Sequence, residues 1–266
     1  MKKLTLMIAL LFISFTLSAC GIGEIVDAFN TTRMELEHTE EFGKVTIHYN
    51  EDEEQYLELV MEAIHETEQE NNRYLSEINH EVQVYLVEEE AFAERFSDDY
   101  AGMAYGFFNK IFINTTKEWW EGEFQTHEDY LRNIVAHEYT HYRMMNATNH
   151  VLPLWFMEGY AEFIATKVSP SLNEYNSYFA YLIPFQTLEE FDDWDYSGDY
   201  FQAGVALQVF MDEQNEGVIQ ELLEDIDIMD DFYDAFERHY GAGFEDFESA
   251  VREELKRLRR GAWDLP

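Results

Sequence analysis

The feature that most constrains how this chain folds is the pentapeptide His137-Glu138-Tyr139-Thr140-His141, followed in the next predicted helix by Glu158. Residues four apart on a helix differ by about 40° in azimuth, so His137 and His141 project from one face, one turn apart. Two neutral imidazoles at this spacing can bind one Zn²⁺ at about 2.0–2.1 Å. Glu138 lies about 100° around the helix, where its carboxylate can accept a proton from a water molecule beside the metal.

The surrounding sequence predicts two helices that would bring these groups together. Apolar residues recur at helical spacing from Tyr130 to Met145 and again from Leu154 to Lys167. The break at 149–153 predicts a short turn, so the second helix returns along the first and carries Glu158 back to the histidines. The alternative is a chance pentapeptide on a solvated helix, which would not explain why a second periodic helix follows with a glutamate in place.

The second helix also resembles a known family. Its string Pro153-Leu154-Trp155-Phe156-Met157-Glu158-Gly159-Tyr160-Ala161-Glu162-Phe163 looks like the P-x-W-L-x-E-G-x-A-E-Y segment of the bacterial peptidase-MA-like gluzincins. Gluzincins are zinc metallopeptidases in which HExxH is followed, on the next helix, by a glutamate that is the third zinc ligand. The resemblance is specific over 132–163 and continues more weakly to about Leu255.

This resemblance implies a role for each residue of the motif. His137, His141 and Glu158 would hold one Zn²⁺ per chain, and Glu138 would be the general base. Glu162 would bind the other ring nitrogen of a ligand histidine, an outer contact that fixes the orientation of an imidazole.

A further catalytic residue is implied by the helix that follows. The segment 199–224 is similar to the gluzincin helix in which a tyrosine near the helix start faces the metal, and Tyr200 occupies that position. Its phenol would donate a hydrogen bond to the oxyanion that develops during the reaction. Tyr196 is the alternative donor, and either residue could instead be one of the 17 tyrosines that fill a core.

Residues 1–19 predict an export signal that ends at a lipid-attachment site. Lys2 and Lys3 precede an apolar run shorter than the roughly 20 residues that cross a membrane. Leu17-Ser18-Ala19-Cys20 resembles the bacterial lipobox, and Cys20 is the only cysteine, so it has no disulfide partner. We therefore expect two acyl chains on Cys20 to anchor the chain at the outer face of a bacterial cell membrane. The alternative is an ordinary secretory signal with an incidental cysteine.

The charge balance restricts the partners. The chain carries 55 acidic and 17 basic residues, a net charge of −38, and removal of the signal would take away two lysines and no acid. Such a surface repels the phosphates of nucleic acid and of anionic lipids. We expect the acidic surface to keep an exposed domain soluble, and a preference for cationic peptides is the alternative. A hydrophobic content of 46% is enough for a core and excludes a disordered acidic tail.

The order of predicted elements indicates an α+β fold, which the resemblance makes zincin-like. Residues 20–40 are a polar tether, and 41–266 form one catalytic unit. Its part 41–126 carries a small mixed sheet with helices, and its part 127–266 is mainly helical and carries the metal site. Predicted strands are Phe42–Tyr49 and Glu81–Val87; predicted helices are Asp52–Ile78, Ala91–Phe96, Asn173–Leu182, Asp199–Phe210, Val218–Ile226, Asp231–Tyr240 and Phe244–Leu258.

An extended segment at Met103–Asn114 has a predicted bend at Asn109-Lys110. In gluzincins an edge strand lies along the cleft and pairs with the substrate backbone. By position, Tyr105–Phe108 or Ile111–Asn114 would serve here, although both could be ordinary interior strands.

The sequence thus favours a membrane-anchored, extracytoplasmic zinc metallopeptidase that hydrolyses peptide bonds in peptides or proteins. No G-x-M-E-N exopeptidase segment precedes the site, which favours an endopeptidase. A non-catalytic zinc-binding lipoprotein that acts as a binding or scaffold module is the main alternative. A metal-dependent hydrolase of a non-peptide amide is another. The sequence does not predict an oligomeric state.

Overall fold

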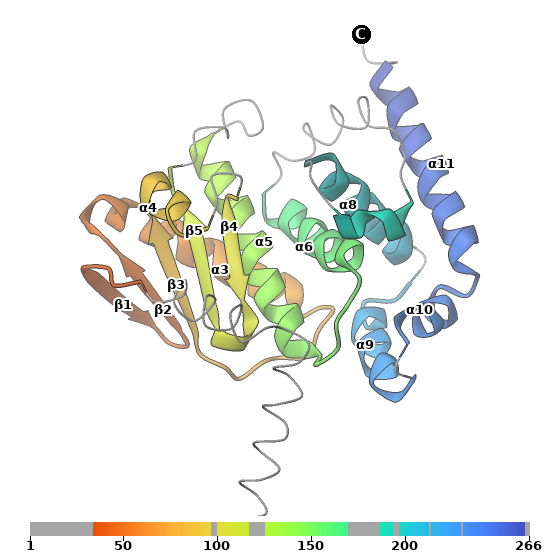
Figure 1. Ribbon diagram of the computed structural model, residues 1–266, viewed down its shortest axis with the longest axis horizontal. Helices are drawn as coiled ribbons and strands as arrows, with labels where there is room; N and C mark the ends of the chain where they lie inside the picture. Colours follow the sequence, from red (N-terminus) through yellow and green to blue (C-terminus); the bar gives the residue numbers. More distant parts are fainter. Residues whose placement is uncertain are drawn as a thin grey trace, which may run out of the picture.

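The computed structural model describes residues 34–96, 100–116, 126–169, 187–193, 197–212, 214–229 and 231–263. These residues form a mixed α+β fold in which a sheet and its helices lie on one side and a group of helices on the other (Figure 1). The predicted signal, Cys20 and the predicted helix Asn173–Leu182 lie outside the described residues. Within the described part of the chain, no helix has both the length and the apolar character needed to cross a bilayer.

One mixed sheet carries the first half of the structure. Its strands are β1 (His38–Phe42), β2 (Val45–Tyr49), β3 (Val82–Val87), β4 (Gly102–Tyr105) and β5 (Lys110–Asn114). They lie in the order β1-β2-β3-β5-β4, with β2, β3 and β5 parallel and each edge strand antiparallel to its neighbour. The interior strands follow the buried, β-branched runs of the sequence, as expected for parallel strands that are covered on both faces.

The prediction of a single strand over Phe42–Tyr49 was wrong at its start. Gly43 has a φ of 67°, and the chain turns there so that Phe42 ends β1 and pairs with Val45 of β2. Glycine adopts this left-handed conformation without steric cost, which permits the tight turn. The strand β1 begins at His38, inside the segment predicted to be a tether, and its exposed polar residues carry no alternating pattern that would have identified it.

The predicted helix Asp52–Ile78 is shorter in the structure. A 3₁₀ turn, η1 (Glu51–Tyr56), precedes α3 (Leu57–Asn71), and the chain leaves the helix after Asn71. Tyr74 and Leu75 lie beyond the helix and pack into the hydrophobic core of the C-terminal helices. Tyr74 and Leu75 are apolar because they are buried among the C-terminal helices, and not because they continue the face of α3 that packs on the sheet.

The two faces of the sheet are covered by different helices. Alternate residues such as Val84 and Ile111 face α3 and α5 (His127–Ala147), while Tyr85 and Phe112 face α4 (Glu89–Ala93) on the opposite side (Figure 1). Burial of both faces explains why the central strands β3 and β5 are nearly continuous apolar runs, whereas β2 alternates between buried and half-buried residues.

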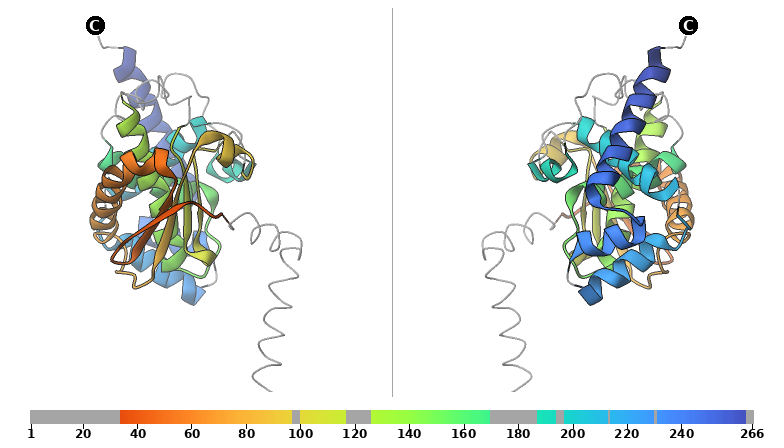
Figure 2. Two further views of the ribbon diagram at one scale, coloured as in Figure 1. Left: turned by 90° about the vertical axis from the view of Figure 1, so that its left-hand side faces the viewer. Right: turned by 90° about the vertical axis from the view of Figure 1, so that its right-hand side faces the viewer.

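The second half is helical. It comprises α6 (Leu154–Val168), η4 (Leu188–Asp193), α8 (Ser197–Asp212), α9 (Val218–Met229), α10 (Phe232–Tyr240) and α11 (Phe244–Trp263). The predicted helices at 154–167, 199–210, 218–226, 231–240 and 244–258 are confirmed with small shifts of their ends, and α11 runs along the outer side of the molecule (Figure 2). Trp155 of α6 lies in their core, with its ring 5.5 Å from that of Phe236 and 5.6 Å from that of Phe247.

Two glycines permit α8 to lie very close to α6. A Cβ on Gly159 would come within 2.4 Å of the backbone oxygen of Ala203 and 2.6 Å of a methyl carbon of Leu207. A Cβ on Gly204 would meet the side chain of Glu162 at 3.2 Å. The backbones therefore approach at a distance that no side chain at position 159 could accommodate.

Candidate metal centre

The central helix of the site is α5, and its start is capped. The side chain of Thr126 accepts a hydrogen bond from the backbone N–H of Asp129 at 3.1 Å, and the first turn carries acidic residues that favour a helix N-terminus. The helix is buried almost continuously from Val135 to Met144 because the sheet, α3 and α6 surround it. It therefore holds the polar side chains of His137, Glu138 and His141 largely away from bulk solvent.

Three predicted ligands meet between α5 and α6. Nε2 of His137 and Nε2 of His141 lie 3.0 Å apart, and each is 3.1 Å from the same carboxylate oxygen of Glu158. Both histidines are buried and Glu158 is half-buried. The turn between the two helices thus brings together the residues that the sequence predicted.

The separations among Nε2 of His137, Nε2 of His141 and the Glu158 oxygen suit three ligands of one tetrahedral metal ion. Ligands of a tetrahedral zinc ion at about 2.0–2.1 Å stand about 3.3 Å apart, close to the separations of 3.0 and 3.1 Å seen here. Two neutral imidazoles and a carboxylate would direct lone pairs at one another, an arrangement that a proton or a cation must bridge. A buried group of His137, His141 and Glu158 could therefore hold a metal ion.

The orientation of His137 is fixed from outside the cluster. Its Nδ1 lies 3.1 Å from a carboxylate oxygen of Glu162, so an Nδ1–H can donate to this acid and leave Nε2 to face the ligands. Burial alone would lower the pKa of His137, but the hydrogen bonds to Glu158 and Glu162 outweigh burial and raise that pKa well above its usual value. Burial alone would raise the pKa of Glu158, but the two histidines hold this pKa well below its usual range.

His141 differs from His137 on its outer side. Among the described residues, no hydrogen-bond partner faces the buried Nδ1 of His141. Only one of the two ligand histidines is therefore held at both ring nitrogens.

Glu138, the predicted base, lies against the sheet. It is buried, and burial raises the pKa of its carboxyl group, opposed by the nearby His137 and His141. A Cβ on Gly102 of β4 would come within 2.5 Å of Cγ and 2.8 Å of Oε1 of Glu138. The carboxylate of Glu138 thus occupies space that any side chain at position 102 would take.

Gly102 is a site residue whose role the sequence did not predict. A glycine in a strand often marks a close approach of another group, and this was the available signal. What the sequence did not reveal was which group approaches, because α5 follows β4 only after an intervening segment.

Tyr200, the predicted oxyanion donor, lies beside the cluster. Its ring is 6.0 Å from the ring of His137. Burial raises the pKa of Tyr200, and the charges of Glu158, Glu138 and Glu162 raise it further, so the phenol stays protonated at neutral pH. The alternative, Tyr196, lies outside the described residues.

The edge-strand alternatives are decided by the sheet order. Ile111–Asn114 belongs to β5, which lies between β3 and β4 and is not an edge. In Tyr105–Phe108, Tyr105 ends β4 and 106–108 form a 3₁₀ turn, η2, before the left-handed Asn109. The edge strand beside α5 is therefore Gly102–Tyr105.

Comparison of the chain with models of known protein families and with curated protein sequences gives no match. Inference about function therefore rests on the site itself.

Proposed function

We propose that this protein is a zinc-dependent peptidase of the gluzincin type, with a zincin-like fold and one zinc ion per chain. The observation that carries the proposal is the convergence of His137, His141 and Glu158, with the buried carboxylate of Glu138 beside them. Two imidazoles and a single carboxylate form the donor set of catalytic zinc in peptidases, and this set leaves a fourth position for water or substrate.

The residues of the chain divide the chemistry between them. A zinc ion in this site would polarise the scissile carbonyl and acidify a water molecule. Glu138 accepts the proton from that water and then delivers it to the leaving amine. Its raised pKa, caused by burial, suits both steps, because the carboxylate can take up a proton and return it.

Tyr200 supplies a hydrogen-bond donor. Burial, together with the carboxylates around it, raises the pKa of this phenol, so its O–H stays available to donate to the oxyanion that develops on the substrate carbonyl. Glu162 holds His137 in the orientation that presents Nε2 to the metal.

The substrate would bind along β4. This strand ends the sheet, and none of the described strands pairs with its outer edge. Because Gly102 of β4 touches Glu138, a peptide added to this edge would extend past the base and the metal ligands. An extended backbone bound in this way favours cleavage within a chain, so we propose an endopeptidase.

We propose that the enzyme acts outside the cytoplasm, anchored by lipid on Cys20 to the outer face of a bacterial cell membrane. The lipobox-like Leu17-Ser18-Ala19-Cys20 after an apolar run supports this placement. The net charge of −38 supports a peptide or protein substrate over nucleic acid.

The experiment that tests the function is cleavage of a mixed peptide library by the full chain in detergent. Zinc-loaded protein should cut, and chelator should abolish cutting. Glu138→Gln should bind zinc with unchanged affinity but lose turnover by about 10²–10⁴-fold, the usual contribution of a general base. Mass spectrometry of the cut sites would give the specificity.

Two outcomes would contradict the proposal. Full activity of Glu138→Gln would remove Glu138 from the mechanism. A protein that binds one zinc ion per chain but cuts no peptide would instead be a zinc-binding scaffold, the alternative that the sequence left open.

A further inference from the structure

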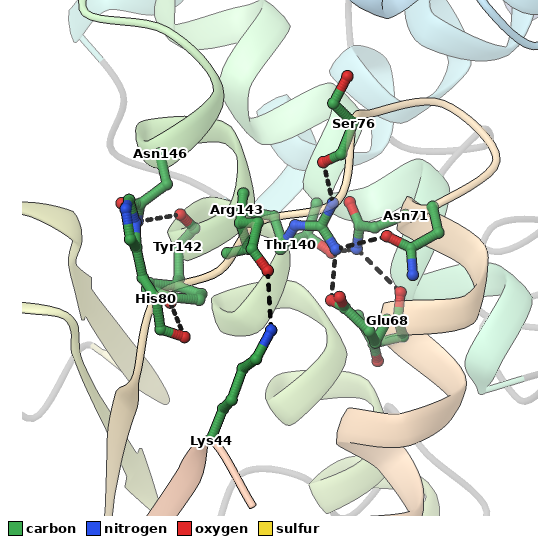
Figure 3. A network of polar contacts seen from close by, with 12 residues as sticks. Lys44, Glu68, Asn71, Ser76, His80, Thr140, Tyr142, Arg143 and Asn146 are labelled. Carbon is green, nitrogen blue, oxygen red and sulfur yellow. Dashed lines mark hydrogen bonds and ion pairs between the residues drawn. The ribbon is translucent and has the colours of Figure 1, made fainter.

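A buried polar network lies behind the metal site, on the side of α5 that faces α3 (Figure 3). Here the fully buried side chain of Asn71, the last residue of α3, contacts both ligand-bearing helices. Its Nδ2 donates to the hydroxyl of Thr140 on α5 at 3.1 Å, and its Oδ1 accepts from the phenol of Tyr160 on α6 at 3.2 Å. One carboxamide therefore bridges α5 and α6.

The two bridged residues adjoin metal ligands in the sequence. Thr140 directly precedes His141, and Tyr160 follows Glu158 by two positions, about 200° around α6. The proposed ligands meet one another between α5 and α6, while Thr140 and Tyr160 bond to Asn71. The separation of 3.1 Å between His141 and Glu158 is thus set by two helices that the same amide holds from behind.

The amide is itself fixed to α3. Nδ2 also donates to the backbone oxygen of Thr67, one turn earlier, at 3.0 Å. Asparagine is suited to this position because its side chain offers donors at one end and an acceptor at the other, which a carboxylate or an aliphatic group does not. Beside it, Arg143 of α5 binds Glu68 and donates to Asn72 at 3.0 Å, so α3 and α5 are held together along the same face (Figure 3).

We propose that Asn71 is a positioning residue of the metal site, which fixes the distance between the α5 and α6 ligands through Thr140 and Tyr160. The inference rests on the proposed metal binding. It does not require peptidase activity. Loss of either the Asn71–Thr140 bond or the Asn71–Tyr160 bond breaks the link from α5 to α6 through Asn71. Loss of both should therefore lower zinc affinity no more than loss of one.

The test is zinc affinity of the full chain, measured by competition with a chelating dye. Thr140→Val and Tyr160→Phe each remove one bond with little change of shape, and each should weaken zinc binding by about tenfold, at the low end for outer contacts of a metal site. The double variant should lose no more than either single variant. In Co²⁺-substituted protein, the visible absorption of the variants should change, because it reports the ligand geometry.

A matched control is Tyr130→Phe, which removes another buried tyrosine hydroxyl of α5, bonded to the backbone oxygen of Asn114 at 3.0 Å and remote from Asn71. It should lower stability without changing zinc affinity or the Co²⁺ spectrum. Asn71→Leu should have the same zinc affinity as the double variant. If Asn71→Leu does not fold, the zinc affinities of Thr140→Val and Tyr160→Phe test the positioning role.

Three outcomes can be told apart. Zinc binding by the original chain with no change in Thr140→Val and Tyr160→Phe would overturn the positioning role. A hundredfold loss in the double variant, the product of two independent effects, would also overturn it. Absence of zinc binding in the original chain would overturn the proposed function and the inference together.

Discussion

The two sides of α5 carry polar groups of opposite character. On the side facing α3, Arg143 pairs with Glu68 and the hydroxyl of Thr140 accepts from Asn71, so most of these polar atoms have partners; Nε of Arg143 has none among the described residues. On the side facing α6, Nε2 of His137, Nε2 of His141 and one carboxylate oxygen of Glu158 converge to within 3.1 Å of one another. Each group combines buried side chains with one carboxylate that is partly exposed, so burial alone does not distinguish a structural network from a site.

The difference lies in how the hydrogen-bonding capacity is used. A network that is satisfied within the protein contributes rigidity and specificity and needs no further ligand. Two imidazole nitrogens and a carboxylate oxygen that converge need a proton or a cation between them, so such a group can bind a metal ion. The predictions below test this distinction between the two sides of the helix.

The largest effect is expected on the metal side. Replacement of Glu158 by Ala should lower zinc affinity by at least about 1000-fold, because a tetrahedral site loses one of its three protein ligands, and each tenfold loss is about 1.4 kcal/mol. Competition with a zinc-binding dye measures this. Zinc affinity within tenfold of the original would show that Glu158 is not a ligand.

On the network side, Arg143→Met should lower the free energy of unfolding of metal-free protein by about 3 kcal/mol. The Arg143 side chain is fully buried and its partner Glu68 is partly exposed, so the loss should lie at the low end for a broken buried pair. Urea denaturation measures this. The control is Arg132→Met, which removes ion pairs to the exposed Glu62 and Glu66 and should cost under about 1 kcal/mol.

An intermediate effect is expected where the sheet meets the helix. Gly102→Ala should reduce kcat by about 100-fold with zinc affinity unchanged, because the new methyl group displaces the Glu138 carboxylate. Steady-state kinetics with a fluorogenic peptide measures this. The control is Gly106→Ala, whose methyl group would collide with Cβ of Met145 at 2.4 Å, an equally close contact that does not involve the base. Equal losses in both variants would assign the effect to general disturbance of the packing between 102–108 and α5, and not to Glu138.

The smallest effect is expected at the outer contact of His137. Glu162→Gln should weaken zinc binding by about tenfold, because the amide keeps the shape but not the charge that orients the imidazole. Isothermal titration with Zn²⁺ measures this change. An unchanged dissociation constant would mean that His137 needs no more outer support than His141, whose Nδ1 has no partner among the described residues.

Much of the site could be predicted from the sequence because its ligands lie on two consecutive helices. The spacing of His137 and His141 is a property of one helix, and a short turn is enough to return Glu158 to them. The helical assignment of the C-terminal part succeeded for a similar reason, since α8, α9, α10 and α11 have long apolar patterns with clear breaks between them.

The contacts that depend on distant segments could not be predicted. The approach of Gly102 to Glu138, and of Asn71 to Thr140 and Tyr160, joins elements far apart in the chain, and no local pattern records which will meet. The strand β1 was missed for the opposite reason: its residues are exposed, so the sheet forms there through backbone hydrogen bonds and leaves no hydrophobic pattern in the sequence.

The close approach at Gly159 has a consequence for any attempt to transplant the site. A helical hairpin carrying only the α5 and α6 segments would reproduce the three ligands, but Tyr200 enters on α8, which reaches its place only because position 159 has no side chain. On the proposed function, a grafted hairpin would therefore carry the proposed metal ligands without the proposed oxyanion donor. A transplant that carries all the proposed groups would need α5, α6 and α8. It would also need glycine at position 159, because any side chain there would prevent α8 from reaching its place.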